Sequence, residues 1–188
     1  AVAQRYWSRF VRQISPERIQ NAVHIEYLMN IARHKKQLDV KKMRAQPIPI
    51  FVKVLDIDRA ATRYVDLRKA PDPFAVLQAS VSTAPYFFPT SMIDGARCID
   101  GGIMEVIGLQ KLLNAHPGAR VVLILSEKLG NERKRMIKNV LEGIAAYPMH
   151  GAPIFRMFLD KARLFEGDVD LAARTDRVLV VRHQKNSP

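Results

Sequence analysis

The turn Asp100-Gly101-Gly102 constrains the fold of this chain more than any other stretch. A short apolar run, Cys98-Ile99, leads into it, and a helical pattern begins at about Glu105. Two adjacent glycines allow backbone conformations that a side chain forbids, and they leave room beside the carboxylate for a substrate or another backbone. An acid on a strand-to-helix turn stands where open α/β sheets usually place ligands. Asp100 is therefore a candidate site residue, although Asp-Gly is also an ordinary turn sequence.

Three further motifs precede this turn in a fixed order: ASVSTAP at 79–85, FFP at 87–89 and IDG at 93–95. Together with the Asp-Gly-Gly turn they resemble the second half of a patatin-like phospholipase domain. The resemblance covers roughly the middle half of the chain, from about residue 38 to residue 126. It implies a lipid acyl hydrolase acting on fatty-acyl esters through a Ser-Asp dyad. Asp100 matches the dyad aspartate, the general base, and Gly101 and Gly102 match the glycines that shape the site.

The other half of that family pattern is absent from these 188 residues. The family carries its nucleophile in a G-x-S-x-G elbow and its oxyanion donors in an earlier glycine loop. Ser82 is the nearest imitation, but an elbow needs a strand before the serine and a helix after it. Residues 73–78 predict a helix before Ser82, so we reject it as the nucleophile. The family's proline after the isoleucine that follows the turn is also replaced, since Gly108 follows Ile107.

These features, and a first residue that is not methionine, lead us to expect a C-terminal portion of a longer protein. The chain then holds a base but neither nucleophile nor oxyanion hole, and by itself it should be inactive. The alternative is a non-catalytic lipid- or polyanion-binding fragment that uses its basic surface.

The expected fold class is a layered α/β/α sandwich with a mainly parallel central sheet, patatin-like and lacking its N-terminal strands. Residues 1–188 are expected to form one domain, with a core at 38–126, a helical segment at 131–165 and a final strand at 177–181. The alternating pattern of 48–55 and its return at 62–67 predict a hairpin. The continuous apolar run at 121–125 predicts an interior strand of the same sheet, covered on both faces.

Helices are predicted from apolar spacing and capping residues. An apolar stripe predicts a helix from residue 131 that Pro148 ends, and a second helix spans 153–164. The stripe consists of Met136, Ile137, Val140, Leu141, Ile144 and Ala145. Further helices are predicted at 2–11, 25–32, 40–44, 73–78 and 103–113.

Thirty basic and 18 acidic residues give a net charge of +12, which attracts polyanions. The basic residues cluster at 33–36, at 41–44 and at 133–138. No nucleic-acid-binding motif accompanies them, so sequence-specific nucleic-acid recognition is unsupported. Each cluster is either a solvated helix face or, if the three lie on one side, a peripheral contact with an anionic membrane.

The remaining features bear on compartment and partners. A lone Cys98 and the absence of a signal-peptide pattern in the first ten residues favour the cytoplasm, with peripheral contact at a membrane. The histidines do not fall at metal-ligand spacing, so neither metal nor cofactor is expected. A sheet that lacks its N-terminal strands would leave an edge uncovered, which predicts self-association.

Overall fold

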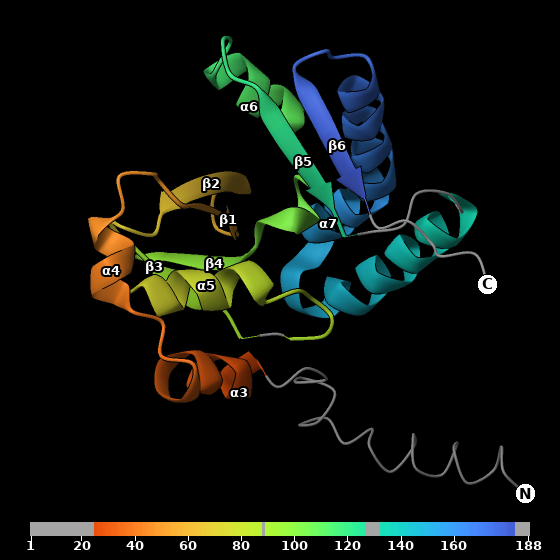
Figure 1. Ribbon diagram of the computed structural model, residues 1–188. Helices are drawn as coiled ribbons and strands as arrows, with labels where there is room; N and C mark the ends of the chain where they lie inside the picture. The colour runs from red at the N-terminus through yellow and green to blue at the C-terminus, as the bar shows by residue number, and fades with distance from the viewer. Residues whose placement is uncertain (1–24, 88, 127–131, 183–188) are drawn as a thin grey trace, which may run out of the picture.

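The computed structural model describes residues 25–87, 89–126 and 132–182, which form a mixed α/β fold with two separate sheets (Figure 1). The helix predicted at 2–11 lies outside the described residues. In chain order the elements are α3 (Ile25–Asn30), the π-helical turn η1 (Ile31–Lys35), α4 (Val40–Ala45), β1 (Phe51–Asp56), β2 (Ala61–Asp66), α5 (Pro73–Val81), β3 (Ser91–Ile93), β4 (Ala96–Asp100), the 3-10 turn η2 (Gly101–Ile103), α6 (Leu109–Ala115), β5 (Val121–Leu125), α7 (Glu132–Ala173) and β6 (Val178–Arg182).

The larger sheet has four strands in the order β2-β1-β4-β3, and every neighbouring pair is antiparallel. The predicted hairpin is confirmed as β1 and β2, although β1 begins at Phe51, after Pro49 has interrupted the pattern. Asp94 and Gly95 join β3 to β4 with φ values of 50° and 77°. Two positive φ values suit the tight turns that match the twist of a hairpin.

The expected mainly parallel central sheet is wrong. β5 pairs in parallel with β6 alone, in a two-stranded sheet that does not include β1. Nor is β5 covered on both faces, because Val122 is 60% exposed and Ile124 is 75% exposed. The helices α6 and α7 cover only the face that carries Val121 and Leu123. An apolar run shows that either face of a strand can be buried, but it does not show that both are.

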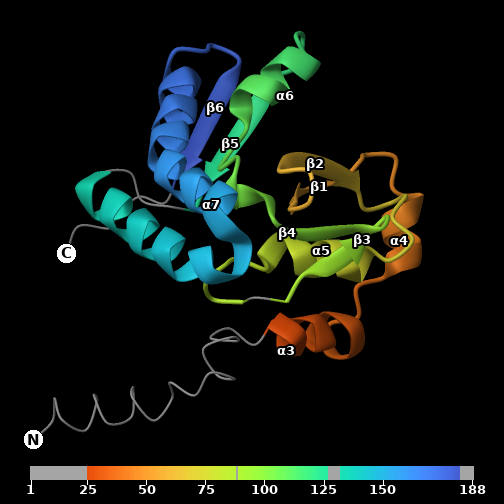
Figure 2. The same ribbon diagram turned by 180° about the vertical axis from the view of Figure 1, so that it is seen from behind.

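Helices pack on both faces of the four-stranded sheet, but unequally: α5 lies along one face, and α7 contacts the other face only near one end of the strands (Figures 1 and 2). Between the sheet and α5, Val54 and Cys98 pack with Val76 and Ala79. On the opposite face, Leu55 and Ile99 of neighbouring strands contact the middle of α7. The residues of this second cluster are Leu55, Ala84, Ile99, Ile103, Ala146, Ile154 and Phe158. On β4, Ala96, Cys98 and Ile99 are buried, whereas Arg97 is exposed and Asp100 is half-buried.

The long element α7 consists of two helices joined at Gly151, where the backbone has φ 72° and ψ −170°. The prediction that Pro148 ends the first helix is wrong, since helical structure continues to Gly151. Only a glycine adopts this backbone conformation readily, so Gly151 turns the chain. Pro153 then lies in the first turn of the second helix, where its missing N–H is harmless. That second helix runs to Ala173, beyond the predicted end at residue 164.

The apolar stripe that predicted the helix from residue 131 lies on the first half of α7, and it is largely exposed. Met136, Ile137, Leu141 and Ile144 are between 49% and 62% exposed. The side of the helix that faces the core of the protein is therefore not the side that carries the stripe.

Several shorter helices follow their local signals. The predicted helix at 40–44 is confirmed as α4, and Asp39 caps it by accepting a hydrogen bond from the Lys42 N–H at 2.9 Å. The helices predicted at 25–32 and 73–78 are confirmed as α3 with η1 and as α5. The one predicted at 103–113 is divided, because Gly108 has a φ of 82°. Within the described residues, no helix combines the length and apolar character needed to cross a membrane.

Candidate functional site

Asp100 is the last residue of β4, the strand that lies between β1 and β3. The 3-10 turn η2 follows at once, and Asp100 caps it: its Oδ1 accepts a hydrogen bond from the Gly102 N–H at 2.8 Å. The predicted strand-to-helix turn is present, although the helix is a single short turn. Asp100 is half-buried, and the two residues before it, Cys98 and Ile99, are buried in the clusters on opposite faces of the sheet.

The segment that follows α5 meets the same carboxylate. Thr83 Oγ1 donates to Asp100 Oδ2 at 2.5 Å, and the Asp100 N–H donates to the Ser82 carbonyl at 3.1 Å. Two motifs 17 residues apart in the sequence are thus joined through one aspartate. Each carboxylate oxygen holds one donor and has capacity for another. A further hydroxyl could therefore deliver its proton to Asp100.

Sequence analysis did not identify Thr83. It lies in the ASVSTAP segment, where only the serines were considered, as possible nucleophiles. The feature that could have pointed to Thr83 is a hydroxyl next to a helix end made of small residues. Nothing in the sequence around Thr83, however, indicates that its partner lies on β4.

The two glycines of the turn serve close packing. A Cβ added to Gly101 would lie 2.6 Å from Lys53 Cγ and 2.9 Å from the Lys53 carbonyl carbon. One added to Gly102 would lie 3.1 Å from Asp100 Oδ1. Neither glycine has a positive φ. The sequence analysis expected these glycines to leave room for a substrate or for another backbone. The structure shows the second role, and the backbone is that of β1.

Lys53 is the second residue that the sequence analysis missed. Its stem lies on Gly101, and its ammonium donates to three successive backbone carbonyls, those of Glu105, Val106 at 3.1 Å and Ile107 at 3.2 Å. Burial lowers the pKa of Lys53, against the opposing charges of Glu105, Asp100 and Asp168. A lysine in the middle of an apolar strand was the available signal. Its cation holds the segment after the turn without hydrogen bonding to Asp100.

Glu105 fixes the same segment from its side chain. Its Oε1 accepts from the Tyr64 hydroxyl at 2.6 Å and its Oε2 from Lys111 Nζ at 2.7 Å. Burial by itself raises the pKa of Glu105, but the hydrogen bonds from Lys111 and Tyr64 outweigh it and the pKa is lowered. A Cβ at Gly108 would collide with this carboxylate. The backbone at Gly108 has a φ of +82°, which favours glycine at this position.

A cavity of about 660 Å³ lies beside this segment, between β2, α6 and the second half of α7. Met104 and Glu105 belong to its lining, but Asp100 does not. Its charged side chains already have partners, with Glu105 bound to Lys111 and Asp160 bound to Arg163. This arrangement does not favour a charged ligand.

Ser82 does not approach Asp100 as a nucleophile would. Its side chain is buried, and its Oγ donates to the Gln78 carbonyl at 2.7 Å. The predicted helix before it is α5. In the described part of the chain, no serine hydroxyl hydrogen bonds to Asp100, and no group of three His, Cys, Asp or Glu residues could hold a metal ion.

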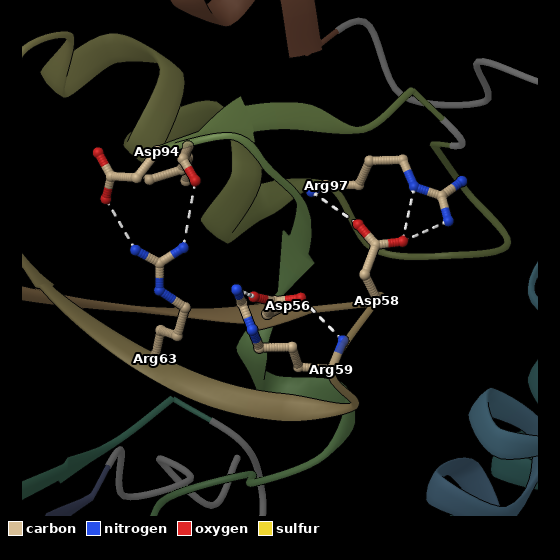
Figure 3. A network of polar contacts seen from close by, with 7 residues as sticks. Asp56, Asp58, Arg59, Arg63, Asp94 and Arg97 are labelled. Atoms are coloured by element: carbon tan, nitrogen blue, oxygen red, sulfur yellow. Dashed lines mark hydrogen bonds and ion pairs between the residues drawn. The ribbon is translucent and has the colours of Figure 1, made fainter.

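Other aspartates of the same sheet face arginines (Figure 3). Asp56 Oδ2 accepts from Arg59 Nη1 at 2.9 Å, and Asp58 Oδ1 accepts from Arg97 Nη2 at 2.6 Å. Asp94 Oδ2 accepts from Arg63 at 2.7 Å across the two hairpins. These ion pairs tie the turn after β1 to β4, and β2 to the turn between β3 and β4.

No family model, curated protein or solved structure matches this chain.

Proposed function

We propose that this chain supplies the aspartate of the Ser-Asp dyad of a lipid acyl hydrolase, with Asp100 as the general base. The observation that carries the proposal is the junction at Asp100. There the ASVSTAP segment and the Asp-Gly-Gly turn, the two motifs most specific to the patatin-like resemblance, meet through two hydrogen bonds. Thr83 Oγ1 donates to Asp100 Oδ2, and the Asp100 N–H donates to the Ser82 carbonyl. The finer fold assignment, a patatin-like layered domain completed by strands outside this chain, belongs to the same proposal.

The chemistry requires a serine hydroxyl beside the remaining acceptor position of the carboxylate. Asp100 takes the serine proton while the serine oxygen attacks the acyl carbonyl. The same proton then passes to the departing alcohol, and water repeats the sequence on the acyl-enzyme. Thr83 and Gly102 orient the carboxylate during both steps. The serine and the oxyanion donors lie outside this chain, so the chain alone is proposed to be inactive.

The test uses a protein in which this chain follows the segment proposed to carry the serine and the oxyanion donors. Asp100→Asn keeps the size of the side chain and removes the basic oxygen. Loss of a positioned general base costs about 10²- to 10⁴-fold in rate, so kcat on a fatty-acyl ester should fall at least 100-fold. The melting temperature should stay nearly unchanged, because Asn can still accept from the Gly102 N–H.

Asp94→Asn is the matched control, since Asp94 also precedes a glycine in a turn. Its backbone has a positive φ, which asparagine adopts as readily as aspartate does. Its kcat should stay within a few-fold of the parent. If Asp100→Asn keeps most of its activity, or loses it only together with its fold, Asp100 is a turn residue and the dyad proposal is wrong.

The second candidate function, non-catalytic binding of lipid or polyanion, depends on where the basic clusters lie. The clusters on α4 and on the first half of α7 are at opposite ends of the molecule in both views (Figures 1 and 2). The three clusters therefore do not all lie on one side of the protein, which the sequence analysis required for contact with a membrane. A flat anionic surface can therefore meet one of these clusters at a time.

A further inference from the structure

The first half of α7 exposes apolar side chains and buries polar ones, the reverse of an ordinary surface helix. Five large apolar side chains on it are between 49% and 62% exposed: Met136, Ile137, Leu141, Ile144 and Tyr147. Asn139 and Glu142 are instead 4% and 5% exposed. The buried Asn139 Nδ2 has no hydrogen-bond partner within the described residues. Soluble helices normally bury the apolar face and expose the polar one. This helix therefore presents a surface suited to a partner.

The exposed residues lie on one face, and lysines border it. Ile137, Leu141 and Ile144 follow each other at intervals of four and three residues, which places them along one side of a helix. Lys134 and Lys138 stand at the edge of this row and line a shallow groove of about 400 Å³ together with Pro85, Tyr86, Ile137, Leu141 and Glu142. We call the set Lys134, Ile137, Lys138, Leu141 and Ile144 the α7 face.

The groove is closed on its inner side by a hydrogen bond. The Tyr86 hydroxyl donates to Glu142 Oε1 at 2.7 Å, and Lys138 Nζ lies 3.6 Å from the same oxygen. Burial and this hydrogen bond raise the pKa of Tyr86 to about 12, so its hydroxyl stays neutral. Lys138 keeps a side chain that is 64% exposed, and Lys134 has no acidic partner among the described residues. Lys134 is thus available to a negatively charged surface, and Lys138, although it forms an ion pair with Glu142, is exposed on the same edge.

We infer that the α7 face docks on an anionic lipid surface. Apolar side chains in the middle of an exposed helix enter the boundary between headgroups and acyl chains, while basic side chains at its edge meet lipid phosphates. Charge favours this partner over a second copy of the chain. Two copies that join these faces bring lysines of like charge together, in a chain whose net charge is +12. An anionic membrane matches the lysines and accepts the apolar row.

This inference is independent of the dyad. It concerns binding of the 188-residue chain to vesicles without any turnover, so its failure leaves the role of Asp100 untouched and its success does not establish that role.

The experiment measures co-sedimentation of the chain with phosphatidylcholine vesicles that contain or lack phosphatidylserine. The chain should bind only the anionic vesicles, and binding should weaken steeply with added salt. Leu141→Glu should reduce the partition constant at least about tenfold, because it places a charge in the row that enters the lipid. The double change Lys134→Ala with Lys138→Ala should reduce it by roughly 25-fold, about fivefold for each basic residue.

Two control variants match these changes elsewhere on the surface. Met92→Glu replaces an exposed apolar side chain on β3, and Lys41→Ala with Lys42→Ala removes two exposed lysines of α4. Both should bind as the parent does. Thermal melts recorded by circular dichroism verify folding, and Leu141→Gln is a milder variant if Leu141→Glu melts early.

Three results would overturn the inference. The first is equal binding to neutral and anionic vesicles, and the second is undiminished binding by the α7-face variants. The third is a dimer in sedimentation that Leu141→Glu converts to a monomer, without vesicle binding by either form. In that case the α7 face is an interface between copies of this chain.

Discussion

Two groups of aspartates in the four-stranded sheet are held in different ways. Around the hairpin turns, Asp56, Asp58 and Asp94 each accept hydrogen bonds from an arginine (Figure 3). At the other end of β4, Asp100 accepts from a threonine hydroxyl and a backbone N–H. No arginine or lysine forms an ion pair with Asp100 in the part of the chain that the structure describes. The nearby Lys53 binds three carbonyls instead.

The arginine-paired carboxylates join parts of the fold, whereas Asp100 is held by neutral donors. An arginine keeps a carboxylate ionised and lowers its pKa, as Arg59 does for Asp56 against the effect of burial. Such a group is a weak base. Neutral donors orient Asp100, and in the proposed dyad its remaining acceptor position would receive the serine hydroxyl. The predictions that follow test whether the two groups differ in this way.

The largest stability effect is expected at Lys53. Lys53→Met keeps the apolar stem on Gly101 but leaves the carbonyls of Glu105, Val106 and Ile107 without their donor. Unsatisfied buried acceptors cost about 1 kcal/mol or more each, so the free energy of unfolding should fall by about 2–4 kcal/mol. Urea unfolding measures it. Lys41→Met on exposed α4 is the control, with a change of at most about 0.5 kcal/mol. A loss below about 1 kcal/mol at Lys53 would show that the cation does not hold the turn.

A smaller effect is expected at Gly101, where β1 and the turn are in closest contact. Gly101→Ala places a Cβ against the Lys53 backbone, and overpacking of this kind costs about 1–3 kcal/mol. Gly95→Ala, in the arginine-paired hairpin, meets no atom within 4 Å but has a φ of +77°. It should cost about 1 kcal/mol through backbone strain alone. Thermal melts of the two variants compare the loss of stability caused by the Cβ contact at Gly101 with the loss caused by backbone strain at Gly95. Equal effects would mean that β1 and the turn can move apart freely.

The smallest effect is expected at Asp56 and depends on pH. The folded protein holds the pKa of Asp56 below its value of about 3.9 in the unfolded chain, so folding favours its ionised form. This contribution is present above the unfolded pKa and is lost as pH falls through the folded pKa. Asp56→Asn should therefore lower the free energy of unfolding by about 1–2 kcal/mol at neutral pH, and the difference should shrink in acid. A difference that is constant with pH would contradict the ionic role of Asp56.

Local signals in the sequence determined several features of this protein. Asp39 before 40–44 predicts the capped helix α4. The apolar run before Asp100 and the glycines after it predict a strand that ends in a turn, which is what β4 and η2 form. Each of these features depends on residues a few positions apart, so the information is complete within the segment.

Only the tertiary structure decided which surfaces those segments share. The residues 121–125 predict a strand, but its partner is β6 and its outer face is exposed. The apolar row on α7 predicts a helix, but the row is exposed, and Ala146 on another side of that helix packs with Leu55 and Ile99 of the sheet. Thr83 and Lys53 contact the Asp100 turn from segments distant in the sequence. The physical reason is the same in each case. The hydrophobicity of a side chain shows that burying it lowers the free energy, but not which residue it will contact. That contact depends on how all the elements pack together, which no single segment encodes.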